Sequence, residues 1–381
     1  MIWSELIGEH LEGVRRSGRW REVNTLCGGP TDVEVTATGE RVVSFASNDY
    51  LGLSAHPAVR RGAKDAVDRW GAGSGSARLI VGGRPVHDDL ETELAAWKGT
   101  EAALSFPTGY QTNVGVLVAL CRAASQLRPV IISDELNHAS IIDGARLARA
   151  EVRVVPHGDV TAFDAAAAAA RRGGRPAVVV SDSVFSMDGD AADVGSLVEV
   201  CRRHEAALVL DEAHMLWGPE PSAADDVVVA RVGTLSKALG ALGGFVAGSN
   251  ALIDLCRNVA RSFIFTTAAS PADAGAALAA LRIVRSEEGA SLVERVRAHT
   301  HRLAPEHPSA VVAVVVGEED AALAASARLR ELGILVPAIR PPTVAPGTSR
   351  LRVTFSAAHT DEQVDRLIGG LGALGLAARP S

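Results

Sequence analysis

The sequence contains few aromatic residues, no closely spaced cysteine pair and no long hydrophobic run. Aromatic side chains make up only 4% of the 381 residues, whereas hydrophobic residues make up 47%, so Ala, Val, Leu and Ile must form most of the core. This composition favours a folded α/β enzyme over a disordered chain. The length suits two domains, or one large α/β domain with a smaller partner.

The cysteine spacing and the hydropathy pattern both favour a cytoplasmic protein. We expect core thiols in a reducing compartment, because no CxxC pair occurs among the four cysteines, Cys27, Cys121, Cys201 and Cys256. No apolar run reaches the roughly 18 residues that cross a bilayer. Segment 1–20 has apolar residues near helical spacing and predicts an amphipathic helix that packs on another part of the protein, with a plain N-terminal arm as the equal alternative. Its interspersed glutamates are unlike a signal peptide.

The chain also lacks an excess of positive charge and a metal-binding motif. Its formal net charge is -7, so we expect no nucleic-acid partner. No HExxH motif occurs, and the group of His299, His301 and His307 has no metal-ligand spacing. The sequence therefore predicts no metal site and surface positions for these three histidines.

Alternation of β-rich and helical segments is the main fold signal. From about residue 100, runs such as PVIIS, AVVVSD and ALVLDEAH alternate with helical stretches, which predicts a parallel sheet with crossover helices. Ligands bind outside the carboxyl ends of strands in such sheets. We expect an N-terminal arm and helix over residues 1–46 that packs with a small domain, a large domain over 47–275, and a small α+β domain over 276–381.

The segment ALVLDEAH places Asp211 and His214 at the end of a predicted strand. A buried carboxylate there needs a cationic partner. A DEAH-box helicase would also need a GxxxxGK[ST] phosphate loop, which the chain lacks. An aspartate that caps a helix is the structural alternative.

The segment GTLSKALGALGG surrounds Lys237 with small and apolar residues. Such surroundings lower the pKa of a lysine and free its amine as a nucleophile. A carboxylate for a pyridinium nitrogen and a lysine that forms a Schiff base are the pair that a pyridoxal phosphate (PLP) enzyme needs. Taken alone, Lys237 is equally consistent with a lysine that caps a glycine-rich turn.

Other segments add candidate groups at the same edge of the sheet. Gly109 and Tyr110 lie at a predicted helix N-terminus, which attracts anions, and Thr234 adds a hydroxyl group. His138 follows a predicted strand, although a structural histidine is the alternative. Acidic residues around Gly189 predict a tight turn rather than a calcium loop.

Nine motifs in a fixed order resemble those of the α-oxoamine synthases, a family of fold-type-I PLP enzymes. They are SNDYLGL, GAGSGSARL, TGYQTN, NHAS, VFSMDGD, DEAH, TLSKALG, FIFTT and SRLRVT, and the resemblance extends from about residue 19 to about 368. It implies an α/β transferase with a large, mostly parallel sheet domain and a smaller α+β domain. It also implies an acyltransferase that joins L-alanine to an acyl thioester, on CoA or acyl carrier protein, with loss of carbon dioxide.

The resemblance implies roles for individual residues and a homodimer with shared active sites. Lys237 matches the Schiff-base lysine, Asp211 the carboxylate at the pyridinium nitrogen, and His138 the imidazole that stacks on the ring. The other matches are His214 and Ser186 at the phenolic oxygen, Gly109, Tyr110 and Thr234 at the phosphate, Thr266 or Thr267 at the phosphate of the neighbouring subunit, and Arg21, Asn48 and Arg352 at the substrate. Arg352 would bind the amino-acid carboxylate, which its planar fork suits.

The segment after DEAH is shorter than is usual in the family, so the sequence leaves the acyl chain open. One alternative is another α-oxoamine synthase, with glycine or serine or a different thioester as substrate. An aminotransferase conflicts with the order of the motifs along the whole chain. A non-catalytic subunit of this fold conflicts with the joint presence of Lys237 and Asp211.

Overall fold

A computed structural model describes residues 2–218, 220–221 and 227–378 of the chain. The helices are α1 (Ile2–Arg16), α2 (Pro57–Trp70), α3 (Pro85–Lys98), α4 (Gly109–Ala123), α5 (Ala139–Ala148), α6 (Val160–Arg172), α7 (Val194–His204), α8 (Asn250–Val259), α9 (Arg261–Ile264), α10 (Pro271–Val284), α11 (Glu287–Leu303), α12 (Glu319–Glu331) and α13 (Asp361–Ala373). The strands are β1 (Leu26–Gly28), β2 (Asp32–Val35), β3 (Glu40–Ser44), β4 (Ala102–Phe106), β5 (Val130–Asp134), β6 (Glu151–Val155), β7 (Ala177–Asp182), β8 (Ala207–Asp211), β9 (Val228–Thr234), β10 (Gly244–Gly248), β11 (Val311–Gly317), β12 (Ile334–Leu335), β13 (Ala338–Ile339) and β14 (Ser349–Thr354).

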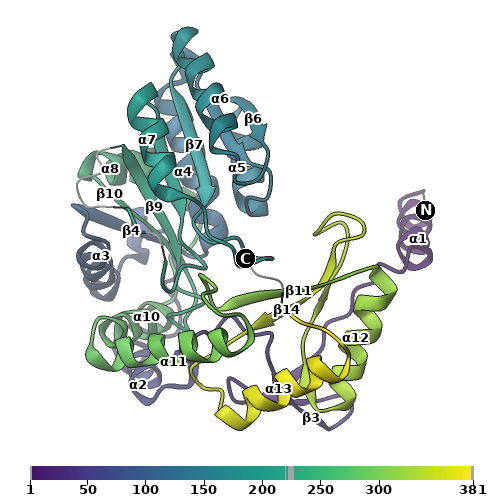
Figure 1. Cartoon of the computed structure of the whole chain (residues 1–381). Helices are drawn as coiled ribbons and strands as arrows, with labels where there is room; N and C mark the ends of the chain where they lie inside the picture. The colour runs from purple at the N-terminus through teal and green to yellow at the C-terminus, as the bar shows by residue number, and fades with distance from the viewer. Residues whose placement is uncertain (1, 219, 222–226, 379–381) are drawn as a thin grey trace.

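A seven-stranded sheet with the order β4-β10-β9-β8-β7-β5-β6 forms the centre of the larger part of the molecule (Figure 1). The five strands from β9 to β6 in this order run parallel, and β10 is antiparallel to both of its neighbours. The mostly parallel sheet and the fold class predicted from the sequence are therefore confirmed.

Helices cover both faces of this sheet, because its strands are apolar on both sides. In β5, Ile131 packs in a core with residues of α4, α5 and α8, whereas Val130 and Ile132 pack in a second core with residues of α6 and α7. Successive strand residues point to opposite faces, so this short apolar run serves both cores. Polar groups gather instead at the carboxyl ends of the strands.

Two smaller sheets complete the fold and bring distant parts of the chain together. One has the order β1-β2-β3-β12, in which β12 is parallel to β3, and the other has the order β11-β14-β13. The turn that contains Gly189 follows β7 of the larger sheet and packs against β11. Gly189 has a φ of +76°, and a Cβ atom there would collide with the carbonyl oxygen of Val311. The predicted tight turn is confirmed.

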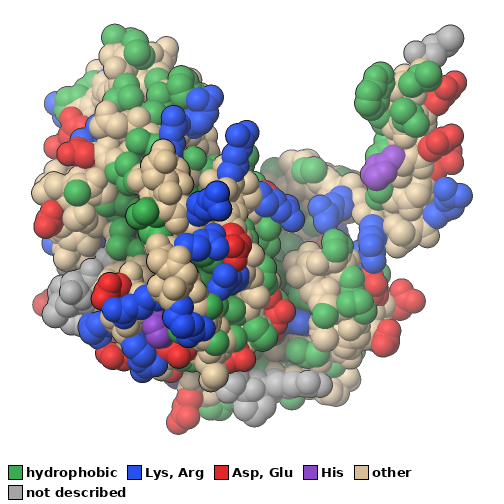
Figure 2. All heavy atoms as spheres, turned by 90° about the horizontal axis from the view of Figure 1, so that it is seen from above, with side chains coloured by type: hydrophobic (Ala, Val, Ile, Leu, Met, Phe, Trp, Pro, Cys, Tyr) green, Lys and Arg blue, Asp and Glu red, His purple; other side chains and the backbone are tan. Residues whose placement is uncertain are grey.

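Helix α1 forms where the sequence predicts a helix, and it stands apart from the rest of the chain (Figures 1 and 2). None of its residues is buried, and Ile2 and Trp3 are 70% and 76% exposed. Packing of this arm on the small domain therefore stays a prediction, as do the bounds of the three domains. Across the described residues, every helix is too short or too polar to span a membrane.

Two predictions about burial are wrong in part. His299 and His307 are buried, at 3% and 4% exposure, because α11 and the segment after it pack against the C-terminal region. Burial lowers the pKa of both imidazoles. Cys27 is exposed on the edge strand β1, whereas the other three cysteines are buried as predicted.

Candidate functional site

A cavity of about 210 Å³ opens at the carboxyl ends of three neighbouring strands. Asp182 ends β7, Asp211 ends β8 and Thr234 ends β9, and the two aspartates are paired in the parallel register. Seven of the predicted site residues line this cavity together: Gly109, Tyr110, His138, Asp211, His214, Thr234 and Lys237. The sheet edge predicted from the sequence is therefore where these side chains meet.

Lys237 is the one lysine of the chain that lines this cavity. The chain has three lysines, and all of them are described. Lys64 is exposed on α2, and the ammonium group of Lys98 forms a buried ion pair with Glu212 at 2.7 Å. Burial lowers the pKa of Lys237 below its usual value, although the charges of nearby aspartates oppose the shift. This environment favours the neutral, nucleophilic amine.

Asp211 is held by neutral donors rather than by a paired cation. The side-chain amide of Asn113 donates to Oδ2 of Asp211 at 2.6 Å, and the backbone N–H of Ala213 donates to Oδ1 at 2.9 Å. The expected cationic partner is thus replaced by amides, while Lys237 is close enough to act on the site by its charge. Asn113 belongs to the TGYQTN motif, one turn into α4 from Gly109, but its role was missed in the sequence.

Asp182 is a second buried carboxyl group in the cavity that the sequence analysis missed. It is 3% exposed, and its Oδ1 atom has no hydrogen-bond partner among the described residues. Burial, together with the charge of Asp211, raises the pKa of Asp182 well above its usual value. Two adjacent buried carboxyl groups resist double ionisation, so we expect Asp182 to carry a proton.

The two cavity histidines are fixed by different neighbours. His138 caps α5, since the backbone N–H of Ser140 donates to its Nδ1 atom at 3.2 Å, so it serves as a helix cap while it lines the cavity. His214 is buried, and its Nδ1 atom lies 2.6 Å from the hydroxyl oxygen of Tyr50. Burial, with the charges of Lys237 and Arg352, lowers the pKa of His214 well below its usual value.

One end of the cavity has the groups of an anion site. Thr108 caps α4 by accepting a hydrogen bond from the N–H of Gln111 at 3.1 Å. The first N–H groups of the helix, those of Gly109 and Tyr110, have no acceptor within the helix and face an anion favourably. The hydroxyl groups of Thr234 and Ser236 lie 2.7 Å apart beside them.

Arg352 and Asn48 lie together, as the predicted substrate role of both residues requires. The guanidinium group of Arg352 donates to Oδ1 of Asn48 at 3.1 Å and to the carbonyl oxygen of Ser186 at 2.6 Å. Ser186 thus contacts Arg352 through its backbone, and it does not line the cavity. Arg21 is exposed in a segment between α1 and β1. The predicted roles of Ser186 at the phenolic oxygen and of Arg21 at the substrate therefore stay predictions.

The threonines after α9 lie near the anion end of the cavity. The side-chain amide of Gln111 donates to the hydroxyl of Thr266 at 3.4 Å, and Thr267 is exposed. The altered segment after His214 cannot be compared with the family in space, because residues 219 and 222–226 lie outside the described part of the chain.

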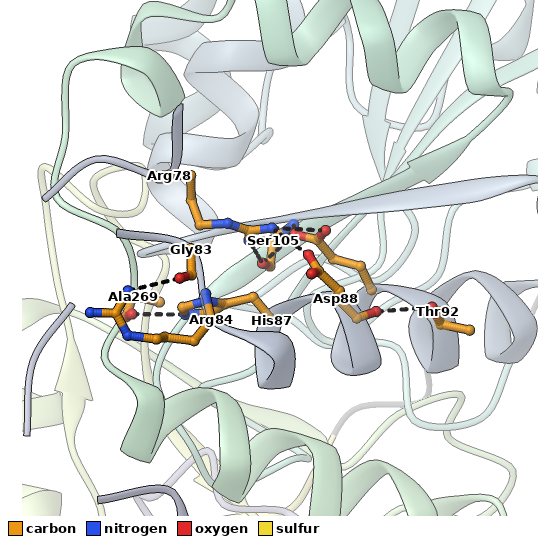
Figure 3. Close-up of polar contacts among 9 residues, drawn as sticks. Arg78, Gly83, Arg84, His87, Asp88, Thr92, Ser105 and Ala269 are labelled. Carbon is orange, nitrogen blue, oxygen red and sulfur yellow. Dashed lines mark hydrogen bonds and ion pairs between the residues drawn. The ribbon is translucent and has the colours of Figure 1, made fainter. Parts of the chain in front are cut away.

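The glycine-rich segment 70–83 contains a short π-helical turn, Arg78–Gly82, and Figure 3 shows the polar contacts around it. Arg78 forms ion pairs with Glu91 and Asp88 at 2.8 and 3.2 Å. Arg84 donates to the carbonyl oxygen of Gly83 at 2.8 Å, and Nε2 of His87 lies 3.0 Å from the carbonyl oxygen of Ala269. These contacts hold three consecutive apolar side chains at the surface, Leu79, Ile80 and Val81, at 48%, 74% and 69% exposure.

A larger cavity of about 1010 Å³ lies between α4, α5 and α9. It is lined by apolar residues and by five arginines, but none of the residues that line it is a lysine, a histidine or an aspartate. The smaller cavity is therefore the one that combines a nucleophile, carboxylates and imidazoles.

Comparisons with known proteins agree with this geometry. Residues 40–371 match the model of the family described as aminotransferase class I and II. The chain is 46% identical to an 8-amino-7-oxononanoate synthase of Anaeromyxobacter dehalogenans, over 97% of this chain and 95% of that protein. It is 45% identical to an 8-amino-7-oxononanoate synthase of Methylobacterium nodulans, over 98% of this chain and 96% of that protein.

Solved structures show the same fold. A serine palmitoyltransferase of S. paucimobilis, with PLP bound as an aldimine of myriocin, superposes with a TM-score of 0.87 at 27% identity. The match covers 97% of this chain and 96% of that structure. An 8-amino-7-oxononanoate synthase of Francisella tularensis shares the fold with a TM-score of 0.70 at 22% identity, over 88% of this chain and 98% of that structure.

Proposed function

Because the chain belongs to the class I and II aminotransferase family and, within it, to the 8-amino-7-oxononanoate synthases, we propose that it condenses L-alanine with a pimeloyl thioester. The chain is a PLP-dependent acyltransferase of biotin biosynthesis, and the proposed products are 8-amino-7-oxononanoate, carbon dioxide and a free thiol. The single observation that carries the proposal to this chain is the cavity in which Lys237, Asp211 and His138 meet.

The residues that line the cavity fit PLP. The first turn of α4 and the hydroxyl groups of Thr234 and Ser236 supply donors for a phosphate. At the other end, the buried carboxylate of Asp211 suits a protonated ring nitrogen, and Lys237 is the residue that would hold the cofactor covalently. When bound, PLP withdraws electrons from the Cα atom of an amino acid and thereby makes loss of the Cα proton feasible.

The chain itself supplies a base, a carboxylate and an imidazole for this chemistry. The lowered pKa of Lys237 leaves its amine able to remove the Cα proton and to return a proton after decarboxylation. Asn113 and Ala213 each donate a hydrogen bond to one carboxylate oxygen of Asp211 and so orient this group. His138 lines the same cavity and is proposed to stack on the ring, which would exclude water from one face.

Arg352 is the proposed site for the substrate carboxylate. Arg352 is 6% exposed, and the carbonyl of Ser186 and the side chain of Asn48 hold its guanidinium group in one orientation. A planar, oriented guanidinium binds a carboxylate through two hydrogen bonds. This contact would fix the amino acid so that its Cα–H bond faces Lys237.

We propose further that two copies of the chain form a dimer and share their active sites. Three observations support this proposal: Leu79, Ile80 and Val81 are exposed on the π-helical turn Arg78–Gly82, Phe265 is 68% exposed, and the threonines at 266 and 267 follow directly. Large exposed apolar side chains in neighbouring segments mark protein interfaces. Light scattering on the full chain should give twice the monomer mass, and a monomer with full activity would contradict the shared site.

Turnover with defined thioesters tests the proposed reaction. The purified chain with PLP should release thiol from pimeloyl-CoA or pimeloyl-acyl carrier protein when L-alanine is present. Cys27 is exposed, so we expect it to react with thiol reagents, and the same mixture without L-alanine sets the background. Acetyl-CoA and glycine are the matched alternative substrates. Release with glycine but not with L-alanine, or with acetyl-CoA but not with either pimeloyl thioester, would overturn the proposal.

A further inference from the structure

Tyr50 links the two ends of the active site although it does not line the cavity. It belongs to the SNDYLGL segment, is 1% exposed, and its hydroxyl oxygen lies 2.6 Å from Nδ1 of His214. The same oxygen lies 3.3 Å from Oδ1 of Asn48, which in turn accepts a hydrogen bond from Arg352 at 3.1 Å. A continuous set of contacts therefore runs from Arg352 to His214.

The protonation states of Tyr50 and His214 leave one proton between the hydroxyl oxygen of Tyr50 and Nδ1 of His214. Burial, strengthened by the charges of Lys237, Arg352 and His138, lowers the pKa of His214 well below its usual value, so its imidazole is neutral near pH 7. Burial raises the pKa of Tyr50 to about 12, although Arg352 opposes the shift, so its hydroxyl group keeps its proton. A neutral imidazole has one N–H donor and one bare nitrogen acceptor.

The distances favour one of the two arrangements of this proton. If Nδ1 of His214 carried the proton, Tyr50 would have to donate to Oδ1 of Asn48 across 3.3 Å. That oxygen already accepts from Arg352, and the positive guanidinium group repels a hydroxyl proton turned toward it. Donation from Tyr50 to Nδ1 of His214 across 2.6 Å is the shorter and better bond.

We propose that Tyr50 donates its hydroxyl proton to Nδ1 of His214 and so fixes the Nε2–H tautomer, which makes His214 a hydrogen-bond donor into the cofactor cavity. Tyr50 is thus a positioning residue that acts through His214. The inference rests on the proposed function for the identity of the acceptor, the phenolic oxygen of PLP. The opposite tautomer would present a lone pair to this oxygen and destabilise its anionic form.

The tautomer can be measured without the cofactor and in the unmodified chain. Nitrogen NMR of the histidine-labelled full chain distinguishes a protonated from a bare ring nitrogen, and a His214→Asn variant assigns the signals. We expect a protonated Nε2 and a bare Nδ1 in His214. A protonated Nδ1 would overturn the inference, whether or not the chain binds PLP.

A second experiment measures the effect on the bound cofactor. In Tyr50→Phe, the pH midpoint of the visible absorption of the PLP-loaded protein should rise by about 0.5 to 1 unit, because the anionic oxygen loses a fixed donor. The matched variant Asn48→Ala removes a contact of Arg352 but leaves the Tyr50–His214 bond, so it should keep the wild-type midpoint and weaken binding of L-alanine.

An unchanged midpoint and tautomer in Tyr50→Phe would contradict the inference. If Tyr50→Phe does not fold, the NMR result on the unmodified chain decides. A chain that binds no PLP would defeat the proposed function and leave the tautomer result intact.

Discussion

The amide nitrogen of Asn113 lies 2.6 Å from Oδ2 of Asp211 and binds a carboxylate that is almost fully buried. The same amide donates to the hydroxyl of Ser140 at 2.9 Å. Both donors of one side chain are therefore used to orient the end of β8 against α4 and α5. This bond joins the part of the cavity that would bind the phosphate to the part that would bind the ring nitrogen.

Replacing Asn113 by Ala should weaken binding of PLP about 10-fold or more. The buried carboxylate loses a charge-assisted hydrogen bond, which typically contributes about 1.5–3 kcal/mol. Fluorescence titration of the cofactor-free chain with PLP measures the change. Asn258→Ala is the matched control, since Asn258 also uses its amide in a hydrogen bond but is exposed on α8. Equal PLP affinity in the Asn113 variant and the wild type would show that this bond does not support the cofactor.

Reduction of the cofactor–protein bond with borohydride should attach PLP to a single peptide that contains Lys237. Among the three lysines of the chain, Lys64 is exposed and Lys98 is buried in an ion pair, so neither faces the cavity. Mass spectrometry of the digested protein identifies the modified peptide. Lys237→Ala should lose both the label and turnover, whereas Lys64→Ala should keep both. A label on Lys98 would show that the cavity assignment is wrong.

The imidazole of His157 lies between two carboxylates and should make folding depend on pH. Its ring nitrogens are 3.0 Å from Oδ1 of Asp134 and 2.8 Å from Oδ2 of Asp190, and these hydrogen bonds raise the pKa of His157 to about 10. The folded-state pKa lies above the unfolded value of 6.5, so the stabilisation is complete below pH 6.5 and is lost as the pH rises through about 10.

Urea unfolding of His157→Gln and of the wild type measures this contribution. The imidazole is 27% exposed, so solvent screening reduces the gain to about 2 kcal/mol. The difference in unfolding free energy should be largest near pH 6 and should shrink toward pH 10. His10→Gln on the exposed face of α1 is the control and should show no such trend. A difference that grows with pH would contradict the assignment.

Removing the charge of Glu212 alone should destabilise the folded chain, because Glu212 forms buried ion pairs. Glu212 follows Asp211 directly, and its carboxylate lies 2.7 Å from the ammonium of Lys98 and 2.7 Å from Nε of Arg231. Glu212→Gln leaves Lys98 without its negative partner and leaves Arg231 with only the more distant Glu220, at 3.5 Å, so the unfolding free energy should fall by about 3 kcal/mol or more.

A second substitution tests whether this loss comes from the unpaired charge. Lys98→Met combined with Glu212→Gln removes one of the two cations and should recover part of the stability. Asp254→Asn breaks an exposed ion pair with Arg257 and is the control, with a change within about 0.5 kcal/mol. If the double variant is less stable than Glu212→Gln alone, uncompensated charge is not the cause.

The sequence predicted the sheet and the catalytic edge because both signals are local. Runs such as ALVLD fix a strand and its polar end at once, and seven predicted residues meet in one cavity. Asp182 ends the run AVVVSD in the same way, so a local signal for it was present and was overlooked. Asn113 and Tyr50 were missed because each acts through a partner that is distant in the chain. Asn113 and Asp211 are 98 positions apart, and Tyr50 and His214 are 164 apart, so no spacing rule relates them.

Burial was the property that sequence patterns predicted least well. His299 was expected at the surface, yet it lies on the inner side of α11, where it faces the carbonyl oxygen of Ser356 at 3.4 Å. Cys27 was expected in the core, yet it lies on the edge strand β1. Both outcomes depend on which elements cover α11 and β1 in the folded chain, and this information is absent from either segment alone.

The pairing of β4 with β10 sets the order in which the site can be completed during synthesis. In the register of this pair Leu104 lies opposite Val246, and among the described strands β10 is the one neighbour of the edge strand β4. Helix α4 follows β4, so the first turn that would bind the phosphate cannot be fixed in place before β10 has left the ribosome. A nascent chain arrested before residue 244 should therefore be unable to retain the cofactor, even though it already contains Lys237.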